Sequence, residues 1–290
     1  MLEQITPLIL TYNEAPNIGR TLEKLHWARD VVVLDSFCDD ETLEIVSRFP
    51  NARVFQRPFD DFASQWNFGL TETGISTEWV LGIDADFIMT DDSIDELRSL
   101  NPSAKTDGYK AQLTYCIHGR QLRSGLLPPL TVLYRRAVSR CSADGHAYRV
   151  VFKGDVGMLK SRILHDDRKP LSCWIEAQQK YTALEGRKIL ASDPSSLSFP
   201  DRVRRLRVIA PMAVLFYCLI IKGGILDGWA GFYYAFQRMF AEVLLSLYLL
   251  EHDFNLKPIA NNAKPELVER PSPPVTVEKQ PDAIAGGGAV

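Results

Sequence analysis

The chain has 290 residues, of which 46% are hydrophobic and 24% charged, a composition typical of globular proteins and unlike that of disordered or collagen-like chains. Its 33 Lys and Arg residues against 36 Asp and Glu give a net charge of −3, so it lacks the basic excess expected of a dedicated nucleic-acid-binding protein. The five cysteines are scattered and form no Cys-x-x-Cys pair, which argues against a disulfide framework or a cysteine-rich zinc site and favours reduced thiols.

The first hundred residues alternate between strand and helix patterns. Four short apolar runs predict strands at Ile5–Thr11, Val31–Asp35, Ala52–Gln56 and Trp79–Ile83. Helical patterns follow the first three runs, beginning near Pro16, Asp39 and Asp60. The uninterrupted run at Val31–Asp35 is typical of a strand buried on both faces. This alternation predicts an α/β fold with a doubly wound, mostly parallel sheet and helices on both faces.

The rest of the chain divides into three parts. From residue 108 to 160 we expect a mixed part of the sheet, with strands at Tyr109–Ile117, Leu130–Arg135, Tyr148–Phe152 and Val156–Lys160. An amphipathic helix is predicted over Leu171–Leu190. The predicted boundaries are 1–170 for the α/β domain, 171–254 for a helical, membrane-associating region, and 255–290 for a proline-rich, disordered tail.

The helical region contains two long apolar stretches, Val208–Ile221 and Trp229–Leu250. About 20 apolar residues are needed to cross a bilayer, so each stretch is at the borderline. We expect an apolar helical hairpin lying in the inner leaflet, with the arginines at positions 202, 204, 205 and 207 facing anionic headgroups. The alternative is a hairpin buried within a soluble protein.

Polar side chains cluster where three predicted strands end. The clusters are Thr11-Tyr12-Asn13-Glu14, Asp35-Ser36 and Asp84-Ala85-Asp86. Ligands of open parallel sheets bind beyond the carboxyl ends of the strands, so we expect these clusters to converge on one site. Asp84 and Asp86 are hard oxygen donors at alternate positions, a pattern that suits Mg²⁺ or Mn²⁺ bound to a diphosphate.

Three segments resemble a known family: TYNEAPNIGRTL (Thr11–Leu22), VVVLDSFCDDET (Val31–Thr42) and WVLGIDADF (Trp79–Phe87). They are similar to the nucleotide-sugar-binding half of the family 2 glycosyltransferases, which have the GT-A fold, and the resemblance covers roughly residues 4–170. The segment Ile163–Tyr181 looks like bacterial members that build lipopolysaccharide core or exopolysaccharide.

The resemblance implies roles for individual residues. Thr11, Tyr12 and Glu14 would line the base and ribose pocket, and Asp35 would hydrogen-bond a uracil ring. Asp84 would face the ribose and the metal, and Asp86 would ligate the metal, with His165 as a further ligand or else a surface histidine.

The resemblance also implies a carboxylate base that takes the proton of the acceptor hydroxyl. Asp144 is the favoured candidate, and Asp166 or Asp167 is the alternative. Many relatives carry Glu after a histidine in this loop, whereas here Ala147 follows His146.

These features predict an inverting, metal-dependent glycosyltransferase at the cytoplasmic face of a bacterial inner membrane. It would move a sugar from a nucleotide-diphosphate donor, UDP-linked by preference, to a lipid-linked or lipopolysaccharide acceptor. Two alternatives stay open. A nucleotidyltransferase would also use paired carboxylates, but the glycine-rich, basic loop that it needs after the first strand is missing from Thr11–Ile18. A membrane-bound scaffold with a degenerate sugar-nucleotide pocket would need no catalytic base.

Overall fold

The computed structural model describes residues 1–144 and 147–254, and all their side chains except those of Asp144 and Ala147. Nine strands form one sheet in the order β3-β2-β1-β4-β8-β6-β11-β5, with β7 paired to β6. These strands are β1 (Ile5–Thr11), β2 (Val31–Asp35), β3 (Ala52–Gln56), β4 (Trp79–Asp84), β5 (Phe87–Met89), β6 (Thr106–Ile117), β7 (Arg120–Gln121), β8 (Leu130–Arg135) and β11 (Asp155–His165). A separate hairpin consists of β9 (Arg140–Asp144) and β10 (Ala147–Val151).

The sheet is mixed rather than mostly parallel, which corrects the prediction. Strands β1, β2, β3 and β4 are parallel to their neighbours, as expected from the strand–helix alternation. Beyond β4, strand β8 runs antiparallel to both β4 and β6, and β5 runs antiparallel to β11. The physical reason is connectivity: β6 and β8 follow one another without the crossover helix that a parallel pair requires.

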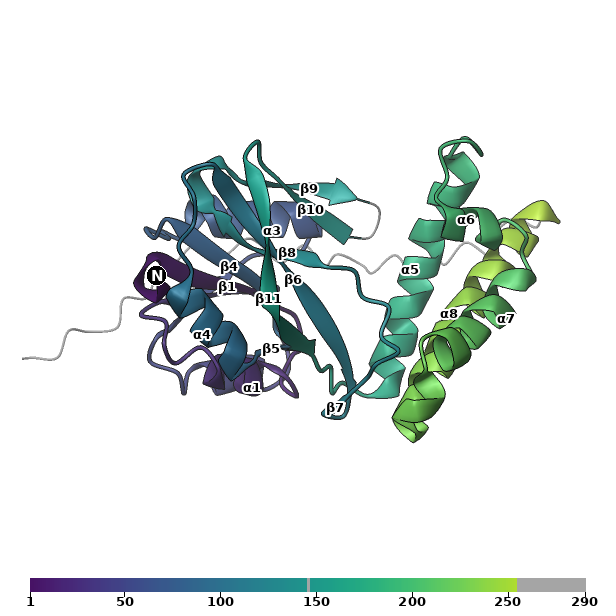
Figure 1. Ribbon diagram of the computed structural model, residues 1–290, viewed down its shortest axis with the longest axis horizontal. Helices are drawn as coiled ribbons and strands as arrows, with labels where there is room; N and C mark the ends of the chain where they lie inside the picture. Colours follow the sequence, from purple (N-terminus) through teal and green to yellow (C-terminus); the bar gives the residue numbers. More distant parts are fainter. Residues whose placement is uncertain (145–146, 255–290) are drawn as a thin grey trace, which may run out of the picture.

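Helices cover both faces of the sheet, as predicted (Figure 1). The helices α1 (Ile18–Glu23), α2 (Thr42–Val46) and α4 (Asp91–Ser99) contribute to one core cluster, and α3 (Phe62–Glu72) contributes to the other, where Tyr148 and Val150 of β10 also pack. The alternation of side chains along β1 separates the two clusters, since Ile5 and Ile9 belong to the first and Leu8 to the second. Helix α4 was not predicted; it begins where the Thr90 hydroxyl accepts a hydrogen bond from the backbone N–H of Ser93, at 3.1 Å.

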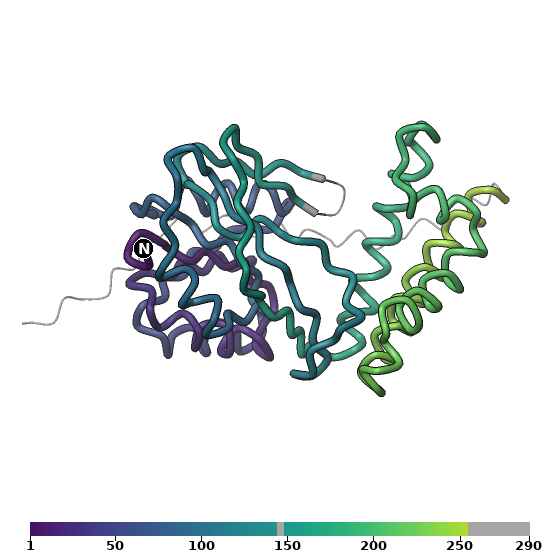
Figure 2. Tube along the Cα trace, in the orientation of Figure 1, coloured from purple at the N-terminus to yellow at the C-terminus, as the bar shows by residue number. Residues whose placement is uncertain are grey.

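The C-terminal helices form a layer beside the sheet, on the side away from the N-terminus (Figures 1 and 2). They are α5 (Leu171–Ala191), α6 (Phe199–Arg204), α7 (Ile209–Phe216) and α8 (Trp229–Asp253), with a π turn at Tyr217–Ile221 and a 3-10 turn at Gly224–Asp227; further 3-10 turns lie at Leu2–Gln4 and Arg136–Val138. Helix α8 packs against α5 and α7. Polar contacts fix the layer to the sheet domain, because Asp227 accepts hydrogen bonds from the backbone and hydroxyl of Ser124 and the Tyr234 hydroxyl accepts one from Leu126.

The structure does not support the predicted apolar hairpin. The polar side chains of α8 point inward, where Glu242 accepts hydrogen bonds from Arg204 and Ser246 donates one to the backbone oxygen of Arg207. Two of the arginines expected to face headgroups are therefore bound inside the layer, Arg204 to Glu242 and Asp201, and Arg207 to Asp253. Within residues 1–144 and 147–254, no helix combines the length and the apolar character needed to cross a membrane.

The Arg204–Glu242 ion pair is expected to stabilise the helical layer. Its Nη2–Oε1 distance is 2.7 Å and only 7% of the Glu242 side chain is exposed. Replacing Glu242 with Gln removes one of the two charge partners of a largely buried guanidinium, so we expect the free energy of unfolding to fall by about 2 kcal/mol.

Urea denaturation of both the variant and the matched Glu251→Gln protein measures this loss. Glu251 lies on the same helix and forms no ion pair with any residue that the structure describes. Equal stability of the two variants would show that the pair contributes nothing.

Candidate functional site

The carboxylate of Asp35 organises the turn after β2. Its Oδ1 accepts a hydrogen bond from the Thr11 hydroxyl, at 3.2 Å, and its Oδ2 accepts one from the Gln56 amide, at 3.0 Å. The backbone N–H groups of Phe37 and Cys38 also donate to it. Asp35 is 0% exposed, and its hydrogen bond to a base stays a prediction. The Asp35 carboxylate stabilises the turn after β2 by accepting hydrogen bonds from the backbone of Phe37 and Cys38.

Two residues beside this turn have left-handed backbone conformations that non-glycine residues adopt at a cost. They are Asn13, with a φ of 54°, and Phe37, with a φ of 63°. The Asn13 side chain donates to Asp39 at 2.7 Å, and its backbone N–H donates to the Cys38 sulfur. The result is an exposed pair of aromatic rings at the end of the sheet, since Tyr12 is 60% exposed and Phe37 is 46% exposed.

Asp84 is the last residue of β4, and Asp86 lies two residues further along the chain. Asp84 lies in register with Leu10 of β1, and Asp86 is buried. The Asp86 Oδ2 atom lies 3.2 Å from Nε2 of His165, the last residue of β11. Burial opposes the ionisation of Asp86, but the facing imidazolium outweighs it and lowers the pKa of Asp86. Burial and the charge of Asp86 raise the pKa of Asp84 to about 7.

A lysine that the sequence analysis missed completes this group. The Lys169 ammonium forms an ion pair with Glu14, and it lies 3.7 Å from Oδ1 of Asp167. Burial raises the pKa of Glu14 to about 7, although the charge of Lys169 opposes this shift. Asn17 bridges the same carboxylates, donating to Glu14 at 2.7 Å and to Asp167 at 2.9 Å.

Asp166, the alternative base, is occupied by structural contacts. Its Oδ2 atom accepts from Arg20 at 2.7 Å and from Arg168 at 2.8 Å, and its Oδ1 atom accepts from the Gly119 backbone at 2.9 Å. Burial opposes its ionisation, but these donors lower its pKa. A carboxylate held in this way suits positioning better than proton transfer.

The favoured base, Asp144, ends β9 at the edge of the described residues. Its side chain, residues 145–146 and the side chain of Ala147 lie outside the described part of the chain. The assignment of the base to Asp144 therefore stays a prediction.

Among the residues that the structure describes, no group of three or more His, Cys, Asp or Glu side chains is arranged to hold a metal ion. The predicted set of Asp84, Asp86 and His165 is therefore not assembled as a closed site, and Asp86 and His165 contact each other instead. The Asp86 Oδ1 atom is nevertheless buried without a hydrogen-bond partner. Such an oxygen fits a divalent cation whose other ligands come from a diphosphate and water.

Residues 8–124 match the family model described as "Glycosyl transferase family 2". These residues contain the turn at Asp35 and the cluster Asp84-Ala85-Asp86, which agrees with the resemblance seen in the sequence. The match covers less than half of the 290-residue chain.

Curated relatives match the same part of the chain. An uncharacterized glycosyltransferase of Rickettsia bellii is 31% identical over 112 residues, which are 38% of this chain and 37% of the relative. One of Rickettsia felis is 31% identical over 111 residues, or 38% of each chain. The chain thus spans little more than a third of the length of these relatives.

Solved structures resemble the chain over most of its length. The mannosyltransferase PcManGT from Pyrobaculum calidifontis, solved with GDP-Man and Mn²⁺, has a TM-score of 0.50 and 14% identity, covering 86% of this chain and 88% of that one. TarS 1–349 of S. aureus, solved with UDP-GlcNAc, has a TM-score of 0.45 and 15% identity, covering 87% and 92%. The fold of the chain is GT-A-like, with a mixed sheet and flanking helices.

The ion pair of His165 predicts a pH-dependent stability of the metal-free protein. Burial lowers the pKa of His165, but the attraction of Asp86 outweighs it and raises the pKa to about 9. The folded-state pKa is thus above the unfolded value of about 6.5, so the stabilisation is complete below that value and is lost as the pH rises through 9. Replacing His165 with Gln should therefore lower the Tm much more at pH 6 than at pH 10.

Thermal unfolding in the presence of a chelator measures the two differences. His26→Gln serves as the control because His26 is exposed. A His165→Gln penalty that is the same at both pH values would contradict the ion pair.

Proposed function

We propose that this chain is an inverting, metal-dependent glycosyltransferase. It transfers a sugar from a nucleotide-diphosphate donor, UDP-linked by preference, to a lipid-linked saccharide in the synthesis of a bacterial lipopolysaccharide or exopolysaccharide. The observation that carries this proposal is the free, buried Oδ1 atom of Asp86 at the carboxyl edge of a family 2 domain. It is a vacant oxygen donor in the place where ligands of such sheets bind.

In this proposal the turns after β1 and β2 bind the nucleoside. Tyr12 and Phe37 offer exposed rings on which a base can stack. The hydrogen bond from the Thr11 hydroxyl to Asp35 connects the two turns that carry these rings. Glu14 lies on the ribose side, next to Lys169. Asp35 acts here as a positioning residue, because all of its contacts are internal.

The diphosphate belongs beside Asp84 and Asp86. These carboxylates, with His165, would hold a Mg²⁺ or Mn²⁺ ion, which would stabilise the leaving diphosphate as a Lewis acid. PcManGT, whose fold is similar, was solved with GDP-Man and Mn²⁺, and we propose ligands of the same class here. Lys169 supplies a second positive charge from the protein itself.

The acceptor hydroxyl needs a base on the side of the sugar opposite the leaving group. We assign this role to Asp144, which ends β9, because Asp166 is bound by Arg20 and Arg168. A lipid-linked acceptor would place the reaction at the cytoplasmic face of the inner membrane.

The proposal predicts metal-dependent nucleotide binding through Asp86. Replacing Asp86 with Asn removes the charge that would hold the cation, so the rise in Tm that UDP and Mn²⁺ cause together should be lost. The measurement is thermal unfolding with UDP, GDP, CMP, TDP or ADP, each with and without Mn²⁺. Asp92→Asn, an exposed carboxylate on α4, is the matched control and should respond like the unchanged protein.

Each result distinguishes between the candidate functions. A rise in Tm with a nucleotide other than UDP would support a glycosyltransferase but contradict a UDP-linked donor. Binding without sugar transfer or donor hydrolysis would favour a scaffold, and release of pyrophosphate from a nucleoside triphosphate would favour a nucleotidyltransferase. No response to any nucleotide would overturn the proposal.

Lys169 is expected to contribute to donor affinity. Its ammonium is the cation that lies among Glu14, Asp167 and Asp86, and charge-assisted contacts to phosphate are strong. Lys169→Met should weaken the binding of a UDP-sugar at least about tenfold, or ~1.4 kcal/mol. Isothermal titration calorimetry measures this change, with the exposed Lys153→Met as the control. An unchanged dissociation constant would remove Lys169 from the donor site.

A further inference from the structure

The outer side of the helical layer carries an exposed apolar surface. On α7 and the following π turn, Met212, Phe216 and Ile220 are exposed and recur every four residues. On α8, Trp229, Phe236 and Phe240 are exposed and lie at helical spacing on one side, and the half-exposed Phe240 ring also contacts Trp174 of α5. We call these six residues the apolar face. Since α7 and α8 pack against each other, the two rows belong to one surface.

The inner sides of the same helices are already covered. Cys218, Ala230 and Tyr234 are buried in one cluster with Leu122 of the sheet domain. The apolar face therefore cannot be explained as the core side of the hairpin. Contiguous exposed apolar patches on this scale mark interaction surfaces.

The segment between Asp201 and Asp227, which contains α7, carries only positive charges. Between residues 202 and 226 the sequence contains four arginines and one lysine but no Asp or Glu. Arg204 and Arg207 are bound by acidic side chains within the layer. Arg205 and Lys222 form no ion pair with any described residue, and the Arg205 Nη1 atom is buried without a hydrogen-bond partner.

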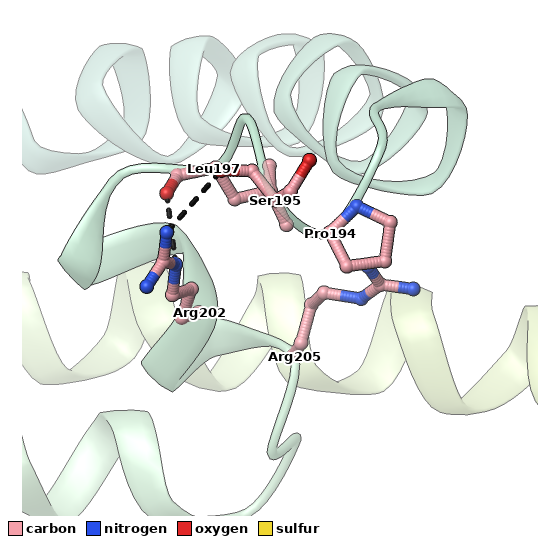
Figure 3. Close-up of a pocket in the computed structure, with 5 residues that line it drawn as sticks. All are labelled: Pro194, Ser195, Leu197, Arg202 and Arg205. Atoms are coloured by element: carbon pink, nitrogen blue, oxygen red, sulfur yellow. Dashed lines mark hydrogen bonds between the residues drawn. The ribbon is translucent and has the colours of Figure 1, made fainter.

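Arg205 also borders a cavity (Figure 3). The cavity has a volume of about 640 Å³ and is lined by Pro194, Ser195, Leu197, Arg202 and Arg205. The Arg202 guanidinium is committed to the protein, since its Nε donates to the backbone oxygen of Leu197 at 3.0 Å. Arg205 makes no such contact with these residues, and its guanidinium lies beside Pro194 in the figure.

We propose that the apolar face binds the surface of a bilayer that contains anionic phospholipid. The face lies in the membrane plane at the boundary of headgroups and acyl chains, where Trp and Tyr side chains are favoured. Arg205 and Lys222 meet the lipid phosphates. A second copy of this chain is the weaker occupant, because a two-fold interface would place Arg205 and Lys222 of both copies in the same interface.

This proposal deepens the proposed function, which already places the reaction at a membrane, and vesicle binding tests it separately from nucleotide binding. The face is on the outer side of α7 and α8, whose inner side packs against Leu122 of the sheet domain. A bound membrane would thus be one layer of helices away from the sheet domain.

Flotation of the full chain with vesicles tests the proposal. The unchanged protein should float with vesicles that contain about 30 mol% phosphatidylglycerol, and floating should decrease with salt because exposed charges are screened. The double variant Leu226→Ser, Trp229→Ser removes the two most exposed apolar side chains of the hairpin tip, at 73% and 84% exposure. We expect its bound fraction to fall at least about tenfold.

A second double variant, Arg205→Gln, Lys222→Gln, should bind phosphatidylglycerol vesicles no better than vesicles of phosphatidylcholine alone. Met158→Ser, an exposed apolar residue on β11, is the control and should float like the unchanged protein. All three should retain nucleotide binding, so a failure of the donor-binding proposal is seen separately.

Three results would overturn this inference. The first is an unchanged protein that stays unbound with both vesicles, and the second is variants that bind like the unchanged protein. The third is a dimer, detected by light scattering, that dissociates in the Leu226→Ser, Trp229→Ser variant.

Discussion

The carboxylate of Asp166 connects parts of the chain that are about 150 residues apart. Its side chain receives Arg20 from α1, Arg168 from its own segment and the backbone of Gly119, and its backbone N–H donates to the oxygen of Asp86 at 3.0 Å. This contact continues the pairing of β11 with β5. Because a buried carboxylate is costly without its partners, all of these contacts are required together. The position of Asp86 beside His165 depends on them.

The same segment balances the charges of the candidate site. His165 faces Asp86, and Lys169 faces Glu14 and Asp167, so the carboxylates near the carboxyl edge of the sheet have cationic partners. A nucleoside diphosphate would add negative charge to a region where, among the residues that the structure describes, Glu14, Asp84, Asp86 and Asp167 already face only His165 and Lys169. Its binding therefore requires an additional cation, or the exchange of Lys169 from Glu14 to phosphate. This requirement is the physical basis for a metal ion in the proposed function.

The sequence predicted those features that depend on local pattern. Apolar runs located β1, β2, β3 and β4, and the polar residues after them do meet at one edge. It could not predict pairs such as Asn17 with Asp167, because no local pattern encodes a contact across 150 residues. Helix α4 was not predicted because its sequence is mostly polar and its start depends on the Thr90 cap. The burial of Asp35 depends on backbone donors at Phe37 and Cys38, which the side-chain sequence does not reveal.

Helix α8 is amphipathic, but its polar side faces the interior of the helical layer and not the solvent. In an isolated amphipathic helix in water, Glu242 and Ser246 would face the solvent. Here they face inward, because Arg204 and the backbone of Arg207 offer them partners. Satisfying these polar groups inside the layer turns Phe236 and Phe240 outward. The exposed apolar surface is thus a direct consequence of the buried ion pair, and removing that surface from water would be the principal energetic gain of any surface that covers it.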